Sequence, residues 1–133
     1  MGLSCSVSNE ALQKGEAWTI EQQQAGCLEV CQAYTIRIES NGKFEYNGKF
    51  KVKHLGRKTG KLSAKEQLEV QHLVEQINWE TIERSYGSNN AQLKVLTYTT
   101  KSMHKKTSYY SGEPQSIKDL AHYIETIIEK DEL

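Results

Sequence analysis

Alternating apolar and polar side chains predict a run of β-strands in the first half of the chain. A first strand begins at 18–20, and residues 34–39 follow the two-residue period of a half-buried strand. The Asn-Gly pair at 41–42 tolerates the positive φ angles of a tight hairpin turn, and a second pair at 47–48 predicts another. Because the alternation resumes at 50–52, these turns predict a meander of antiparallel strands.

Helical spacing replaces this alternation in two later segments. Residues 56–60 are polar and predict a loop. Ser63 and Glu66 then form a capping box, in which each side chain accepts from the backbone amide of the other, and a helix continues behind it to about residue 77. A further helical turn is expected over 79–86. The last helix follows the single proline, and its apolar residues form one stripe: Ile117, Leu120, Ala121, Ile124, Ile127 and Ile128.

Two strands are predicted between the helices. Residues 93–100 carry apolar side chains on both sides, which indicates an interior strand, and residues 104–110 form its polar hairpin partner. The predicted order is β-β-β-β-α-β-β-α. This is an α+β fold in which a meander and a C-terminal hairpin form an antiparallel sheet with two helices packed on one face. We expect residues 1–16 to be a flexible lead and residues 17–133 to be a single domain.

Composition excludes several classes of function. The chain has 133 residues with 17 basic and 17 acidic side chains, so its overall charge gives no reason to expect a nucleic-acid partner. Only two aspartates occur, Asp119 and Asp131, which leaves little for an aspartate-based triad or a Mg²⁺ or Ca²⁺ site. No apolar run approaches the ~20 residues of a membrane span. We therefore predict no catalytic residue, no cofactor and no metal.

The segment Cys27-Leu28-Glu29-Val30-Cys31-Gln32-Ala33-Tyr34 resembles the opening signature of a bacterial family of unknown function, family 6438. That signature reads Cys-x-Gly-x-Cys-Pro-x-Tyr and leads into a strand and a glycine hairpin, as here. Glu29 and Gln32 stand where the family has Gly and Pro, so we expect a more relaxed turn between the cysteines. The likeness extends over about residues 17–130. It implies an exported, often lipid-anchored protein, and it implies no activity.

The cysteines are the first candidates for chemistry. Cys27 and Cys31 lie close enough in sequence for a small disulfide-bonded loop, but buried free thiols are an open alternative. A redox use is the third reading, although thioredoxin-like chemistry uses a shorter Cys-x-x-Cys spacing at the start of a helix. In a lipid-anchored protein, Cys5 would be the residue that carries the lipid.

Basic residues are the second candidate group. Seven crowd residues 43–61 with only one acidic residue among them, and a possible anion-binding surface comprises Lys49, Lys51, Lys53, Arg57 and Lys58. The alternative is the solvated face of an edge strand, where lysine discourages pairing between sheets. Tyr98, Tyr109 and Tyr110 are a third group that would suit a sugar or peptide, but tyrosines on a sheet more often fill cross-strand pairs.

Three hypotheses about function follow. We favour a non-catalytic binding or accessory domain of the bacterial cell envelope, periplasmic or membrane-anchored, that contacts a protein or another envelope component through its sheet. The second hypothesis is a thiol-dependent redox protein or enzyme that uses Cys27 and Cys31. The third is a cytosolic interaction module with free thiols. The sequence names no ligand and no oligomeric state.

Overall fold

The computed structural model describes residues 16–25, 32–50, 52, 54–87 and 93–130. Within these residues it has one mixed sheet, two α-helices and a short 3-10 helix. The strands are β1 (Trp18–Gln24), β2 (Ala33–Glu39), β3 (Lys43–Phe50), β4 (Gly56–Lys61), β5 (Ser85–Tyr86), β6 (Lys94–Thr100) and β7 (His104–Tyr109). The helices are α2 (Ala64–Glu75), the 3-10 helix η1 (Trp79–Thr81) and α3 (Gln115–Ile128).

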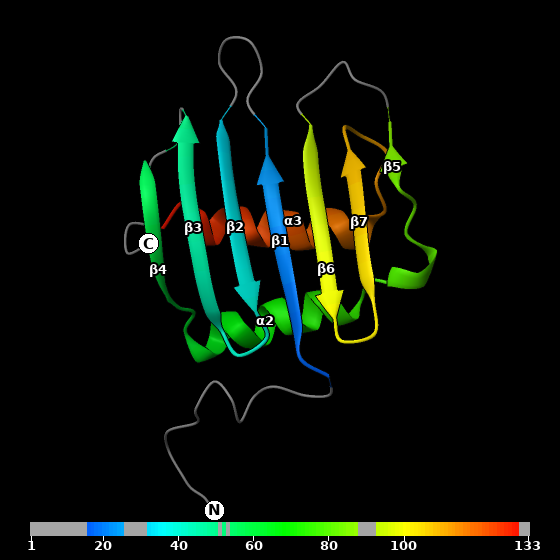
Figure 1. The fold of residues 1–133 in the computed structure, drawn as a ribbon, viewed down its shortest axis with the longest axis horizontal. Coiled ribbons are helices and arrows are strands. Elements are labelled where there is room, and N and C mark those ends of the chain that lie inside the picture. Colours follow the sequence, from blue (N-terminus) through cyan, green and yellow to red (C-terminus); the bar gives the residue numbers. More distant parts are fainter. Residues whose placement is uncertain (1–15, 26–31, 51, 53, 88–92, 131–133) are drawn as a thin grey trace, which may run out of the picture.

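The sheet runs in the order β4-β3-β2-β1-β6-β7-β5. All its pairings are antiparallel except that of β5 with β7. Figure 1 shows both helices behind the sheet, on the same face, with the opposite face uncovered. The predicted α+β fold, its element order and its helices on one face are therefore confirmed. β6 lies between β1 and β7, so its predicted interior position is also correct.

The second predicted turn is wrong. β3 continues without a break through Asn47 and Gly48, and its pairing with β2 extends past them. Gly48 serves a close approach instead, because a Cβ there would collide with the carbonyl oxygen of His54. The chain turns later, and residues 56–60, expected as a polar loop, form most of the edge strand β4. Sequence periodicity missed β4 because all its residues are exposed, so neither of its sides is apolar.

A buried core fills the space between the sheet and the helices. The inner strand positions alternate with polar outer ones, and the buried apolar side chains are Trp18, Ile20, Tyr34, Ile36, Ile38, Tyr46, Leu96 and Tyr109. α3 packs its predicted stripe on them, since all six apolar residues of the stripe are buried. Its burial removes five large apolar side chains and one alanine from water, at roughly 1.5–3 kcal/mol for each of the large ones. α3 is thus the main apolar cover of the sheet.

α2 is a more polar cover. Its predicted capping box is present, with Ser63 as the N-cap residue. Two of its buried residues are glutamines, Gln67 and Gln71, and Gln67 Nε2 donates to the carbonyl oxygen of Ser40 at 2.7 Å. A buried amide needs such a partner because an unpaired one costs about 1–3 kcal/mol. This bond therefore ties the middle of α2 to the β2–β3 turn.

The segment after α2 is only partly helical. The helical turn expected over 79–86 is confined to η1, and Tyr86 lies instead in β5. Trp79 packs against Tyr98 with ring centroids 4.2 Å apart and planes nearly parallel. Tyr109 is buried in the core, so these tyrosines are scaffold residues. The sugar- or peptide-binding face considered for Tyr98, Tyr109 and Tyr110 stays a prediction.

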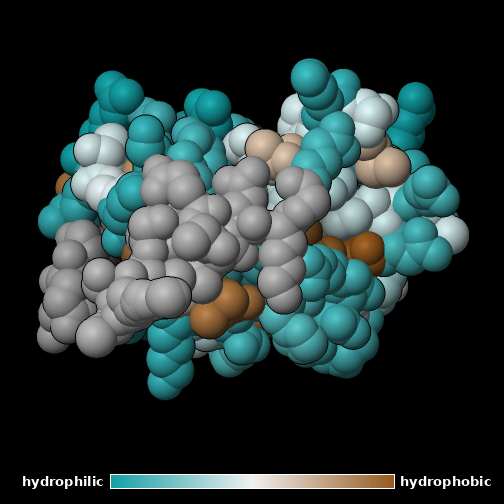
Figure 2. All heavy atoms as spheres, turned by 90° about the horizontal axis from the view of Figure 1, so that it is seen from below, coloured by the Kyte–Doolittle hydropathy of each residue, from teal (hydrophilic) through white to brown (hydrophobic). Residues whose placement is uncertain are grey.

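The surface is mostly hydrophilic. In the view from below in Figure 2, hydrophobic residues show only as small separate patches among hydrophilic ones and the grey atoms. Among the described residues, the exposed large apolar side chains are those of Phe50, Leu55 and Leu68. None of the described helices has the length and apolar character needed to cross a membrane.

Candidate functional site

The predicted cysteine sites lie outside the described residues. Cys27 and Cys31 fall in the connection between β1 and β2, and Cys5 falls in the N-terminal segment. The disulfide, the free thiols and the lipid attachment therefore stay predictions. Gln24 and Gln32, which flank the two cysteines, are described, and Gln24 Nε2 donates to the carbonyl oxygen of Gln32 at 3.5 Å.

The predicted anion-binding residues are described only in part, and the described ones lie on both faces of the sheet. Lys51 and Lys53 are outside the described residues. Arg57 and Lys58 are neighbours on β4, so their side chains point to opposite faces of the sheet. Arg57 pairs on the outer face with Glu45 at 2.5 Å. Lys49 is exposed at the irregular end of β3, while Lys58 lies on the helix side and lines a hollow.

This hollow is here called the basic groove. It has a volume of about 670 Å³ and lies between β4, the start of α2 and the end of α3. The residues that line it are Phe44, Lys58, Thr59, Gly60, Lys61, Leu62, Ser63, Glu66, Ile127 and Lys130. Three of these side chains are cationic and one is anionic, so the described lining is positive.

The floor of the basic groove is apolar. Leu62 and Ile127 are buried core residues that also face the groove, and Phe44 is only partly buried. Gly60 pairs with Phe44 across the β3–β4 ladder. A Cβ at Gly60 would lie 3.1 Å from the Phe44 ring, so glycine leaves the ring uncovered. The groove therefore offers an aromatic contact between cationic side chains.

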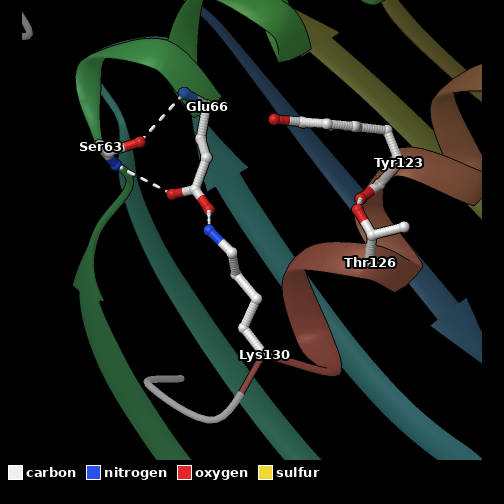
Figure 3. A network of polar contacts seen from close by, with 5 residues as sticks. All are labelled: Ser63, Glu66, Tyr123, Thr126 and Lys130. Carbon is white, nitrogen blue, oxygen red and sulfur yellow. Dashed lines mark hydrogen bonds and ion pairs between the residues drawn. The ribbon is translucent and has the colours of Figure 1, made fainter.

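The rim of the groove is held by a polar network, shown in Figure 3. The backbone amide of Ser63 donates to Glu66 Oε1 at 3.0 Å, and the amide of Glu66 donates to Ser63 Oγ at 3.1 Å. Lys130, just beyond α3, extends its ammonium group to Glu66 Oε2. Glu66 thus belongs to two interactions at once, and it joins the start of α2 to the end of α3.

The charge state of Glu66 follows from these contacts. Burial alone would raise the pKa of its carboxyl group, but the hydrogen bonds from Lys130 and from the Ser63 amide outweigh burial and lower it. Glu66 is therefore ionised at neutral pH, with both oxygens engaged. A carboxylate in this state suits structural pairing better than proton transfer, which favours a pKa near the working pH.

The β3–β4 connection fixes the end of α3 from the other side. Tyr46, which is fully buried, donates its hydroxyl hydrogen to the carbonyl oxygen of His54 at 2.7 Å. The His54 ring nitrogen Nε2 is 2.9 Å from the carbonyl oxygen of Lys130. Carbonyl groups at a helix end lack intrahelical partners, so a donating imidazole stabilises them. Lys130 is thus anchored through both its backbone and its side chain.

The groove continues over the exposed edge of β4. A second hollow of about 460 Å³ on the outer face shares Phe44, Thr59, Gly60 and Lys61 with it. Lys61 lines both hollows at the end of β4. The arrangement can bind a negatively charged group through lysine and an attached apolar part through Phe44. No cluster of three or more possible metal ligands is found among the described residues.

Sequence reasoning found only part of this site. It singled out Lys58 and the capping box, but not Phe44, Gly60 or Lys130 as binding residues. The pattern did contain a signal, because Gly60 opposite Phe44 is a glycine in a strand, and such a glycine often marks a close approach. That signal was hidden once residues 56–60 were interpreted as a loop.

Comparison with protein families gives one match. The family model described as a domain of unknown function, DUF6438, matches residues 19–128. The chain belongs to the DUF6438 family. The match covers every described strand and both α-helices, apart from the first residue of β1, so the DUF6438 domain is the α+β unit described above. The resemblance noted in the sequence is thereby confirmed at the level of the family. None of the curated proteins matches this sequence.

Proposed function

We propose that this DUF6438 domain is a non-catalytic binding module of the bacterial cell envelope that takes an amphiphilic anion in the basic groove. An amphiphilic anion here means a carboxylate or phosphate attached to an apolar chain, as in a fatty acid or an anionic lipid. The observation that carries the proposal is the combination, in one hollow, of an apolar floor at Phe44 with lysines at its rim.

The chemistry of the groove supports binding over catalysis. Lys58 and Lys61 are exposed, and lysine is a compact charge suited to phosphate and carboxylate groups. The one carboxylate in the described lining, Glu66, is ionised and engaged with Ser63 and Lys130. Burying apolar chain against Phe44 adds roughly 0.8 kcal/mol for each CH₂ group removed from water. Charge and apolar contact therefore act on the same ligand.

The envelope setting is part of the proposal. It is supported by the exported, often lipid-anchored character that the family resemblance implies. Membrane surfaces there present anionic headgroups, which attract lysine by about 1 kcal/mol for each residue near the surface. Fractionation of the native bacterium tests the setting directly. We expect the protein in the envelope fraction, and recovery in the cytosol would contradict this part and favour the cytosolic interaction module.

The ligand is tested by sedimentation with lipid vesicles. We expect the domain to bind vesicles that contain phosphatidylglycerol and not vesicles of phosphatidylcholine alone. The double variant Lys58→Gln/Lys61→Gln should weaken this binding by about thirtyfold, since it removes two lysines worth about 1 kcal/mol each. Monomeric decanoate, measured by calorimetry, separates a free amphiphile from a membrane surface as the source of the ligand.

A matched variant controls for general charge. Lys106→Gln/Lys118→Gln removes two lysines on β7 and α3, outside the described lining of the groove. It should leave vesicle binding nearly unchanged. Equal losses in both double variants would show a diffuse charge effect and contradict a groove site. If the native protein binds neither the vesicles in sedimentation nor decanoate in calorimetry, the proposed ligand is wrong.

A further inference from the structure

A separate hollow lies at the other end of the inner sheet face, and it is here called the polar pocket. It has a volume of about 250 Å³. The residues that line it are Gln24, Gln32, Tyr34, Val52, Lys94, Glu125, Ile128 and Glu129. Six of these eight residues are polar or charged, and the pocket lies between the sheet and α3. This concentration of polar groups suits the recognition of a polar ligand.

An ion pair forms one wall of the polar pocket. Lys94 Nζ lies 3.3 Å from Glu125 Oε2, and about a third of each side chain is exposed. A lysine ammonium has three hydrogens and a carboxylate has two oxygens, so one contact leaves capacity on both groups. The wall therefore offers a positive and a negative group side by side.

Tyr34 and the glutamines form the adjoining wall. Tyr34, Gln24 and Lys94 occupy facing positions on β2, β1 and β6, so they form one row across three strands. Tyr34 is 3% exposed, and its hydroxyl oxygen accepts from Gln22 Nε2 at 2.9 Å. No acceptor for the Tyr34 hydroxyl hydrogen is found among the described residues. Gln22 Oε1 is buried and has no hydrogen-bond partner among the described residues, and with the amide O and N exchanged it would accept the Tyr34 hydroxyl hydrogen.

The protonation state of Tyr34 makes it a donor. Burial raises the pKa of its hydroxyl far above the ordinary value, and the hydrogen bond from Gln22 offsets only part of this rise. The negative charges of Glu125 and Glu129 raise the pKa of this hydroxyl further. Tyr34 is therefore protonated at any physiological pH. Its hydroxyl can therefore donate to the carboxylate of a ligand in the pocket, in exchange for the contact with Gln22.

The charged groups of the polar pocket and the neutral Tyr34 hydroxyl indicate which class of ligand it can bind. Lys94 and the Tyr34 hydroxyl can hold a carboxylate, while Glu125 and Glu129 at the C-terminal end of α3 attract an ammonium group, as helix ends with free carbonyls also do. We propose that the polar pocket binds a small zwitterion of the amino-acid class. The ligand's carboxylate lies at Lys94 and Tyr34, and its ammonium group lies at Glu125.

The pocket's size narrows the class further. Ligand pockets for drug-sized molecules measure about 300–1,000 Å³, so a pocket of about 250 Å³ suits a ligand with few atoms. Among the described residues, its aliphatic lining consists of Val52 and Ile128. These two side chains favour a small aliphatic group over a charged one. Alanine is therefore a better probe than lysine or glutamate.

The test is a titration of the isotope-labelled protein followed by NMR. We expect alanine to shift the amide signals of Gln24, Tyr34 and Lys94 in a saturable way. Acetate and methylammonium, which each carry half of the zwitterion, should bind at least tenfold more weakly. Equal shifts with acetate alone or with methylammonium alone would overturn the zwitterion, and no saturable shift with alanine would overturn the site.

Variants distinguish recognition from folding. Tyr34→Phe removes only the hydroxyl and should weaken alanine binding about tenfold, the size expected when a hydrogen bond to a charged group is lost. Tyr123→Phe removes a hydroxyl on α3 that does not line the pocket and should leave binding unchanged. Glu125→Gln keeps the shape and should also weaken binding. If Tyr34→Phe binds alanine as tightly as the native protein while it folds normally, the proposal is wrong.

Discussion

The two hollows share the end of α3 but differ in what the sheet supplies beneath it. In the basic groove, β3 and β4 supply Phe44 and Gly60, so the floor is aromatic and the charges stand at the rim. In the polar pocket, β1, β2 and β6 supply Gln24, Tyr34 and Lys94, so the hydrogen-bonding groups lie at the centre. One helix end therefore covers two sites of opposite character.

The comparison separates residues that stabilise the fold from residues that can recognise a ligand. An apolar floor such as that of the groove adds to the core even without a ligand, because Leu62 and Ile127 are buried in any case. The polar residues beneath the pocket do the reverse, since the buried Gln22 beside Tyr34 has an amide oxygen that no described protein contact uses. Local departures from a fully apolar core of this kind are expected at functional sites.

The largest expected effect tests the part that the two hollows share. Ile124 is fully buried in the middle of α3, so Ile124→Ala should lower the free energy of unfolding by about 2–5 kcal/mol. Urea denaturation measures this change. Binding of both decanoate and alanine should fall together, because both sites need α3 in place. Ile124→Val, expected to cost about 0.5–1.5 kcal/mol, is the matched control. If Ile124→Ala weakened the binding of only one of the two ligands, the two hollows would not both depend on α3.

The next effect separates the groove from the pocket. Ser63→Ala removes the oxygen that accepts from the Glu66 amide and should lower the free energy of unfolding by about 1 kcal/mol in thermal or urea denaturation. It should also weaken decanoate binding, because the start of α2 forms the groove wall. Alanine binding should stay the same, since Ser63 does not line the pocket. A loss at both sites would show that the two hollows are coupled.

Acid should weaken the polar network at the rim of the groove. The pKa of Glu66 in the folded protein is lowered from its ordinary 4.5 by the bonds from Lys130 and Ser63, which outweigh the opposing effect of burial. Its contribution to stability is therefore complete above pH 4.5 and is lost as the pH falls through the lower folded pKa. Unfolding curves measured from neutral pH downwards should show this loss. Glu66→Gln should reduce the acid dependence, and an unchanged acid dependence would contradict the pairing.

The smallest effect concerns Gln22, the hydrogen-bond partner of Tyr34. Gln22→Leu removes a buried amide that has one unpaired oxygen, but it also leaves the buried Tyr34 hydroxyl without its partner. Because these two effects oppose each other, the free energy of unfolding should change by about 1 kcal/mol or less in urea denaturation. Binding of alanine should weaken, because Tyr34 loses the neighbour that orients its hydroxyl. A large loss of stability would show that Gln22 is a structural residue, and the pocket would then lose its functional explanation.

The fold was predictable from sequence wherever one side of an element is apolar. The alternation at 34–39 and the stripe of α3 each require one buried face, and both predictions are confirmed. β4 and β5 were not predictable, since β4 is exposed throughout and β5 has two residues. Asn47 and Gly48 misled because the same dipeptide suits a tight turn or a close backbone approach, and only the contact with His54 decides which.

The sites were less predictable than the fold. Lys58 stood out as one of several basic residues, but the opposite direction of Arg57 is visible only once both lie on one strand. Lys130 and Glu66 are 64 residues apart in sequence, and no local pattern links them. The polar pocket depends on three strands in register, which brings Tyr34, Gln24 and Lys94 into one row. The spacing of these residues along the chain does not predict such a row.

The central claim is that the basic groove binds the apolar chain and the charge of the same ligand. The most direct measurement is NMR mapping of decanoate on the isotope-labelled protein, with alanine present so that the polar pocket is occupied. The account predicts saturable shifts at Phe44, Gly60 and Lys61, and no such shifts at these positions in Lys58→Gln/Lys61→Gln. Shifts confined to the outer strand positions around Arg37 and Lys106, with Gly60 unmoved, would contradict it.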